Sequence, residues 1–251
     1  MIRVENVNKS FNKNQVLKDI SMTFESGRTN IIIGRSGSGK TVLLKSIVSL
    51  FNIDSGSIYY DDRDITRLNF KQLKEIRKEV GMLFQGGALF DSQTVLENVM
   101  FPLDMFSNMS KIEKLKRVAF CLERVNLSGV GRLYPSEISG GMNKRVAIAR
   151  AIALNPKYLF CDEPNSGLDP VTSLLIDNLI QEITKEYNMT TIINTHDMNS
   201  VMEIGEKIMF ISEGRKCWEG SKDDIFNSDS QELNDFVFAS ELCKRIKDVK
   251  K

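Results

Sequence analysis

The most constraining feature of the sequence is a glycine-rich segment between an apolar run and a helical pattern. Residues 34–41 read Gly-Arg-Ser-Gly-Ser-Gly-Lys-Thr and match the pattern G-x-x-x-x-G-K-[ST]. The β-branched run 31–33 precedes the segment, and apolar residues at helical spacing follow over residues 40–51. The pattern predicts a buried strand, a phosphate-binding loop and a helix, with a plain glycine turn as the alternative.

The residue types in this segment suit a nucleoside triphosphate. Glycines let the backbone N–H groups wrap phosphate oxygens, and the helix N-terminus adds partial positive charge. Lys40 supplies a full charge to the β- and γ-phosphates, and the Thr41 hydroxyl is a ligand for Mg²⁺. We therefore expect ATP and Mg²⁺ as cofactors, with the nucleotide held by Gly34, Arg35, Ser36, Gly37, Ser38, Gly39, Lys40 and Thr41.

Apolar runs along the rest of the chain predict an α/β fold. Buried strands are expected at 80–84, 158–161, 191–193 and 208–211. Helices lie between most of them, and the clearest spans 171–187, with an apolar face of Leu175, Leu179, Ile180 and Ile183. Strands alternating with helices favour a mostly parallel, doubly wound sheet. The first 30 residues instead show short apolar runs typical of a small antiparallel sheet.

The strand signal disappears between residues 85 and 139, which indicates an inserted helical subdomain at about 87–138. Ser110 fits the N-cap of a helix there, whose shared face is Ile112, Leu115, Val118, Ala119, Leu122 and Val125. We expect an ATPase domain over 1–220 and a C-terminal extension over 221–251. The extension has an apolar stripe that could dock on a neighbour, made of Leu233, Phe236, Phe238 and Leu242.

Two carboxylates and the single histidine follow predicted strands. Asp162 would hold Mg²⁺ at the end of its strand, and Glu163, one residue further, would act as the general base on the attacking water. His196 follows the strand 191–193 and would contact the γ-phosphate at the same sheet edge. A solvated strand end and a passive histidine are the alternatives.

Composition excludes several other classes of function. Lys and Arg number 34 against 33 Asp and Glu, so no basic stripe for nucleic acid is expected. No basic leader and no apolar stretch long enough to span a bilayer is present in the sequence. Cys121, Cys161, Cys217 and Cys243 have no zinc-like spacing and read as reduced thiols. These features predict a cytoplasmic location.

With these motifs the sequence resembles the ATP-binding cassette (ABC) family over nearly its whole length. Residues 138–146 look like the signature loop of that family, and residues 166–169 resemble its D-loop. Gln85 resembles the glutamine of its Q-loop, and His196 resembles its switch histidine. Ser139, Gly140 and Gly141 open a helix, so they form a second anion site. The resemblance implies a head-to-tail dimer in which these residues clasp the nucleotide of the other copy and Asp169 crosses the interface. It also implies that Gln85 has a catalytic and metal-binding role. Phe11 would stack on adenine, and the alternative is that Phe11 is a packed core residue.

One departure from the family suggests a subgroup. Met142 stands where the family's signature has Gln, and the resulting motif resembles the ATPases of Mla/MCE-type phospholipid transporters. That resemblance implies a membrane permease, an MCE-domain lipid-binding protein, and a place on the cytoplasmic face of the inner membrane. A groove beside Gln85 would receive the permease. The residues that could line this groove are Leu89, Phe90, Met100 and Phe101, and the alternative is that they belong to the core. The alternatives are an importer of another substrate and a soluble ABC ATPase such as that of iron–sulfur cluster assembly.

Overall fold

A computed structural model describes residues 1–238, and its strands form two sheets. The smaller sheet has the order β2-β1-β4-β5 and every pairing in it is antiparallel. Its strands are β1 (Ile2–Phe11), β2 (Asn14–Phe24), β4 (Ser55–Tyr60) and β5 (Arg63–Asp64). The antiparallel sheet expected from the first 30 residues is therefore confirmed.

The larger sheet has the order β10-β9-β3-β8-β7-β6. Its strands are β3 (Arg28–Ile33), β6 (Val80–Leu83), β7 (Tyr158–Asp162), β8 (Thr190–Asn194), β9 (Lys207–Ser212) and β10 (Arg215–Gly220). All its pairings are parallel except that of β9 with β10. The predicted α/β fold is confirmed, and the carboxyl ends of β3, β7 and β8 meet at one edge, where such sheets bind ligands.

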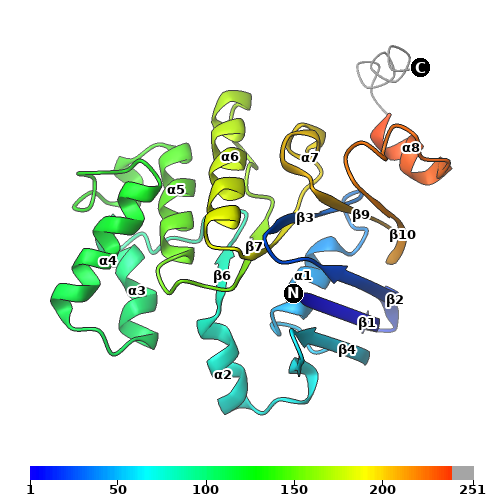
Figure 1. Cartoon of the computed structure of the whole chain (residues 1–251), viewed down its shortest axis with the longest axis horizontal. Helices are drawn as coiled ribbons and strands as arrows, with labels where there is room; N and C mark the ends of the chain where they lie inside the picture. Colours follow the sequence, from blue (N-terminus) through cyan, green and yellow to red (C-terminus); the bar gives the residue numbers. More distant parts are fainter. Residues whose placement is uncertain (239–251) are drawn as a thin grey trace.

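Helices cover this sheet and form a lobe at one end of it (Figure 1). They are α1 (Lys40–Ile47), α2 (Phe70–Lys78), α3 (Val95–Phe106), α4 (Lys111–Arg124), α5 (Gly140–Ala151), α6 (Pro170–Glu186), α7 (Met198–Ile204) and α8 (Gln231–Val237), with the short 3-10 helices η1 (Ile65–Arg67) and η2 (Pro135–Glu137). Helices α3 and α4 lie at the opposite end of the molecule from β1, β2 and β4. The boundaries of the helical subdomain stay a prediction.

Three helical faces differ from those expected. Helix α1 ends at Ile47 because Ser49 adopts a left-handed φ of 55°, and Leu50 is exposed. On α4 the expected N-cap Ser110 is present, but Ile112, Leu115 and Ala119 are exposed. The face that α4 buries is Val118, Cys121 and Leu122. On α6 Leu175 is exposed and Ile176 takes its place in the core.

The predicted docking stripe of the C-terminal segment packs on its own chain instead. Leu233 and Phe238 are buried in the core cluster of the larger sheet, and the Phe236 ring lies 5.3 Å from that of Phe210 on β9. Leu242 and Cys243 lie outside the described residues. Within residues 1–238, no helix combines the length and the apolar character needed to cross a membrane.

Candidate active site

The phosphate-loop residues lie where the sequence predicts them, between β3 and α1. Gly34 has a φ of 154°, and a Cβ there would clash with the backbone carbonyl of Ile211 on β9. The loop then turns at Gly37 and Gly39, which have φ values of 79° and 106°. Glycine is required at Gly34 because the loop backbone passes against the neighbouring strand, and the turn leaves the helix N-terminus open to the cavity.

Lys40 is a buried cation on the wall of this cavity. Its Nζ donates to the carbonyl oxygens of Gly34 at 2.8 Å and Arg35 at 3.2 Å. Burial lowers the pKa of the Lys40 amine, and the carboxylates of Glu163 and Asp162 partly offset that effect. The ammonium group is thus held against the inside of the loop, with two acidic groups near enough to act on its charge.

Asp162 and Thr41 come from different segments and meet at the sheet edge. The Thr41 hydroxyl donates to Asp162 Oδ1 at 3.2 Å, and the side-chain amide of Asn194 donates to the same oxygen at 3.3 Å. Asn194 ends β8 and is fully buried, and its Oδ1 has no hydrogen-bond partner within residues 1–238. A hydroxyl, a carboxylate and an amide oxygen are hard ligands of the type that Mg²⁺ prefers.

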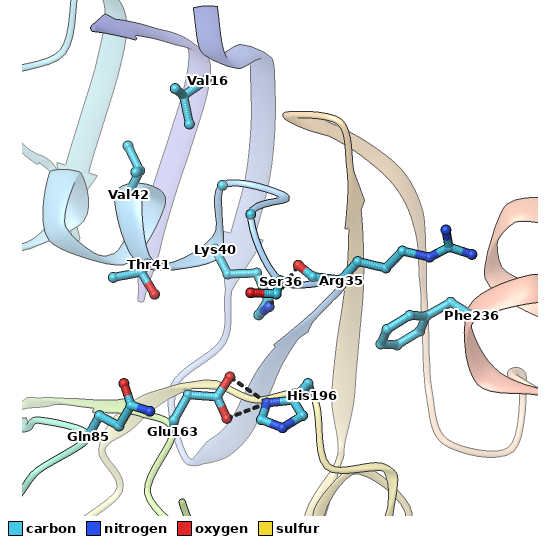
Figure 2. A pocket seen from close by; sticks show the side chains of 12 residues that line it. Val16, Arg35, Ser36, Lys40, Thr41, Val42, Gln85, Glu163, His196 and Phe236 are labelled. Carbon is cyan, nitrogen blue, oxygen red and sulfur yellow. Dashed lines mark hydrogen bonds and ion pairs between the residues drawn. The ribbon is translucent and has the colours of Figure 1, made fainter. Parts of the chain in front are cut away.

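Glu163 and His196 are paired side by side across the cavity from Lys40 (Figure 2). His196 Nδ1 lies 2.9 Å from Glu163 Oε1 and 2.8 Å from Oε2. Glu163 adopts a left-handed φ of 49°, and its N–H donates to the Asn194 carbonyl at 2.9 Å. Its side chain is 15% exposed and that of His196 66%. A left-handed glutamate costs free energy, and such strained residues cluster at functional sites.

Gln85 reaches the cavity from the segment after β6. Its side-chain amide donates to Ser166 Oγ at 3.2 Å, and its backbone carbonyl accepts a hydrogen bond from the buried Lys144 ammonium on α5. Gln85 therefore joins the cavity to the helical lobe through its backbone and to the 166–169 loop through its side chain.

The cavity encloses about 610 Å³, which is within the usual size of a small-molecule site. Its lining also includes three apolar residues without a functional signature in the sequence: Val16, Val42 and Phe236. Phe236 comes from α8 and lines the same cavity as Arg35 (Figure 2). Apolar side chains of this kind are ordinary in a sequence, and only the fold shows that they face the site.

Phe11 is placed differently from the other expected residues. It ends β1, is 39% exposed, and packs edge-on against Phe51 with ring centroids 5.4 Å apart. Lys9 Nζ lies 5.2 Å from the centre of its ring. Phe11 is not among the residues that line the cavity, so adenine stacking on it stays a prediction.

A second pocket of about 610 Å³ lies around the N-terminus of α5. Ser139 caps this helix by accepting a hydrogen bond from the Met142 N–H at 3.2 Å. A Cβ on Gly141 would lie 2.7 Å from Thr172 Cγ2, so glycine there allows α5 and α6 to approach closely. Asp169 caps α6, and hydrogen bonds from Thr172 and Val171 lower the pKa of its carboxyl. Met142 packs on the core and does not line this pocket.

The site so far defines a nucleotide-binding ATPase class: a phosphate loop, a strand-end aspartate, and a glutamate–histidine pair on one parallel sheet. A family model described as ABC transporter matches residues 17–166. The chain belongs to the ABC transporter family and is an ATPase of that family.

Similar proteins agree with this assignment. The chain is 41% identical to the methionine import ATP-binding protein MetN of Clostridioides difficile, over 94% of this chain and 74% of the relative. It is 36% identical to the probable ribonucleotide transport ATP-binding protein mkl of Mycobacterium bovis, over 94% and 66%. A dimeric, post-hydrolysis structure of the ATP-binding cassette MJ0796 with ADP and Pi superposes with a TM-score of 0.81 and 33% identity, covering 88% of this chain and 99% of that one.

Proposed function

We propose that this chain is the subunit that hydrolyses ATP to power a membrane permease, with Glu163 as the general base. The observation that supports this most is the Glu163–His196 pair, 2.8 Å apart, on the cavity wall facing Lys40. A base must lie within hydrogen-bond reach of the proton it removes, and the γ-phosphate held by Lys40 would place the attacking water next to this pair.

In this mechanism the Glu163 carboxylate accepts a proton from water as the water oxygen bonds to the γ-phosphorus, and ADP leaves in line. His196 Nδ1 faces Glu163 and keeps its carboxylate oriented. The other ring nitrogen, Nε2, can then donate to a γ-phosphate oxygen only when the imidazole is protonated. His196 thus has two roles: orienting the base and stabilising charge on the phosphate.

Mg²⁺ fits the polar cluster at the end of β7. Thr41 and Gln85 line the Lys40 cavity, and Asp162 is joined to Thr41 by a hydrogen bond, so Thr41 and Asp162 would supply oxygens to the ion. When bound, the ion would neutralise charge on the β- and γ-phosphates. Mg²⁺ sites of this kind use one or two protein oxygens together with phosphate oxygens and water, which is the ligand set available here.

The second pocket supports a head-to-tail dimer. Ser139, Gly140 and Gly141 form a helix N-terminus that can bind an anion, yet they share no lining residue with the Lys40 cavity in the described chain. In a head-to-tail pair each such N-terminus would close over the other copy's γ-phosphate, and Asp169 would lie at the interface. Closure on ATP and reopening after hydrolysis would form the working cycle.

An apolar groove of about 340 Å³ beside the end of β6 is the proposed permease contact. Phe84, Phe90, Phe101 and Phe106 line it, and the rings of Phe90 and Phe101 lie 4.8 Å apart. Leu89 and Met100 instead pack on the core, so the core interpretation holds for these two. An exposed aromatic groove fits a helix of a membrane partner, and it would place the chain on the cytoplasmic face of a membrane.

The cargo is the finer part of the proposal. The similarity to methionine import ATP-binding proteins favours a transporter that imports a small molecule such as methionine. The phospholipid hypothesis, with its MCE-domain partner, is a second candidate that depends on Met142 in the signature loop, and the relatives do not support it. A soluble ABC ATPase is disfavoured by the apolar groove. Copurification from detergent-solubilised membranes, followed by identification of bound proteins and lipids, separates these candidates.

Glu163→Gln tests the hydrolytic mechanism. We expect ATP turnover to fall by at least about 100-fold while ATP binding is kept, and the ATP-bound dimer to accumulate in size-exclusion chromatography. Turnover at the parent rate would show that Glu163 is not the general base.

For the permease contact, Phe90→Ser with Phe101→Ser should abolish copurification with a permease while sparing ATP binding.

A further inference from the structure

Three polar side chains from segments near Glu163 and His196 in the fold are buried. They are Asn165, Asp177 and Ser200, with exposures of 8%, 2% and 1%. The Asn165 side-chain amide donates to Ser200 Oγ at 3.0 Å, and both side chains lie close enough to the Asp177 carboxyl to lower its pKa. A carboxyl is rarely buried to this extent, because removing it from water costs free energy unless it is paired.

Two of the three residues come from the segments that follow the proposed catalytic side chains, and the third lies on a helix that packs against one of them. Asn165 lies two residues after Glu163 in the turn that leads to the 166–169 loop, where the Ser166 N–H donates to the Glu163 carbonyl at 3.2 Å. Ser200 lies on α7, which begins directly after His196 and Asp197. Asp177 lies on α6, which packs against α7. The carboxyl therefore links the loop of Glu163 to the helix that follows His196.

We propose that Asp177 is a positioning residue for ATP hydrolysis, fixing the Glu163 loop relative to His196 through Asn165 and Ser200. This inference rests on the proposed roles of Glu163 and His196. Small displacements of a catalytic base cost large factors in rate, because the base must reach the attacking water in one geometry. A buried hydrogen-bonded network is a suitable means to hold two loops in register.

The charge around Asp177 makes this link sensitive to protonation. Burial raises the pKa of the Asp177 carboxyl to about 6, the hydrogen bonds from Ser200 and Asn165 lower it in part, and the carboxylates of Asp197 and Glu203 on α7 raise it further. Cys161 on β7 also interacts with it. One oxygen of Asp177 and the Asn165 amide oxygen have no partner within residues 1–238. A proton on Asp177 would add a donor to a cluster that contains these two unpartnered acceptor oxygens.

The first test compares Asp177→Leu with Thr184→Val, a matched polar deletion on the same helix. Thr184 is fully buried and hydrogen-bonds to the Ile180 carbonyl and to Thr191. We expect Asp177→Leu to lower kcat about tenfold with KM for ATP nearly unchanged, and Thr184→Val to change neither by more than about twofold. A folded Asp177→Leu protein whose kcat matches the control would overturn the proposal.

The second test does not depend on Asp177→Leu folding. Asp177→Asn keeps the shape and offers a donor and an acceptor at every pH, as the protonated acid does. The kcat ratio of this variant to the parent should be near one at about pH 5 and rise at least about twofold by pH 8. A ratio that is flat or falls contradicts the proposal. If Glu163→Gln hydrolyses ATP at the parent rate, the proposed function is wrong. If Glu163→Gln loses turnover but the Asp177 variants behave like their controls, only the proposed role of Asp177 is wrong.

Discussion

The cavity at Lys40 and the pocket at Ser139 have the same volume of about 610 Å³ but different chemistry. The Lys40 cavity contains a buried ammonium group, a carboxylate and an imidazole. The Ser139 pocket offers a helix N-terminus and the carboxylates of Asp169 and Glu182. Its Arg145 already donates to the carbonyls of Val125 and Asn126. The first region has the groups that the proposed hydrolysis needs, and the second has the helix N-terminus proposed to hold the nucleotide of another copy.

Helix α6 connects these two regions. Leu175, Ile176 and Leu179 line the Ser139 pocket, while Asp177 on the same helix contacts the segments that carry Glu163 and His196. The two regions therefore share one helix, which would link the proposed half-sites within one chain.

The largest effect is expected from removing the cation of the Lys40 cavity. Lys40→Met should weaken ATP binding by at least about 100-fold and abolish turnover, because a buried charge on the β- and γ-phosphates is lost. Stability should not fall, since the ammonium group is costly to bury. Nucleotide binding by calorimetry measures the effect. Lys45→Met, on the same helix and directed at Phe51, is the control and should bind ATP normally.

A smaller effect is expected at the second pocket. Ser139→Ala should lower turnover about 100-fold, because a polar donor at the transferring phosphate is lost, with ATP binding to the single copy unchanged. Ser110→Ala is a matched control, since Ser110 caps α4 as Ser139 caps α5. Both variants should lose about 1 kcal/mol of stability. Equal turnover in the two would mean that Ser139 acts only as a helix cap.

Protonation of Asp177, the buried carboxyl on α6, should change the free energy of unfolding. The raised pKa of Asp177, about 6 against 3.8, means that the folded chain binds a proton more tightly than the unfolded chain. This contribution is full below about pH 4 and is lost as pH rises through about 6. Asp177→Asn should thus be more stable than the parent at pH 7 by on the order of 2–3 kcal/mol, and the gain should vanish near pH 4.

Denaturant unfolding across this pH range measures that difference. Asp229→Asn, an exposed carboxyl outside both regions, is the control and should leave the pH dependence unchanged. A constant difference between Asp177→Asn and the parent would show that Asp177 does not titrate in this interval.

The smallest effect is expected at Met142. Its side chain packs on the core instead of lining the Ser139 pocket. Met142→Gln should therefore change turnover by less than about threefold, and a half-buried amide should cost up to about 1 kcal/mol of stability. Steady-state ATPase assays and thermal unfolding measure these changes. A tenfold change in turnover would place Met142 in the working surface of that pocket.

Much of the site was predictable from local sequence, and some faces were not. The positions of Lys40, Asp162, Glu163 and Ser139 follow from short motifs at strand and helix ends, and the structure places each at the expected element. The expected burial of Leu175 and the expected docking of the C-terminal stripe on a neighbour were wrong, since Leu175 is exposed and the described part of the stripe packs on its own chain. The place of Phe236 on the cavity wall was not predicted. Apolar residues at helical spacing show that a helix has a buried face, but which neighbour covers it depends on packing.

The sequence alone determined the glycine loop before α1, the α/β alternation and the capped start of α5, because glycine, capping and strand-end residues act on the backbone within a few positions. Only the tertiary structure decided that Glu163 meets His196, that Asn194 supports Asp162, and that Asp177 joins Asn165 to Ser200. Those contacts join segments separated by 32 or 33 residues in the first two cases. Their geometry comes from the order of β3, β8 and β7 in the sheet, which no local pattern encodes.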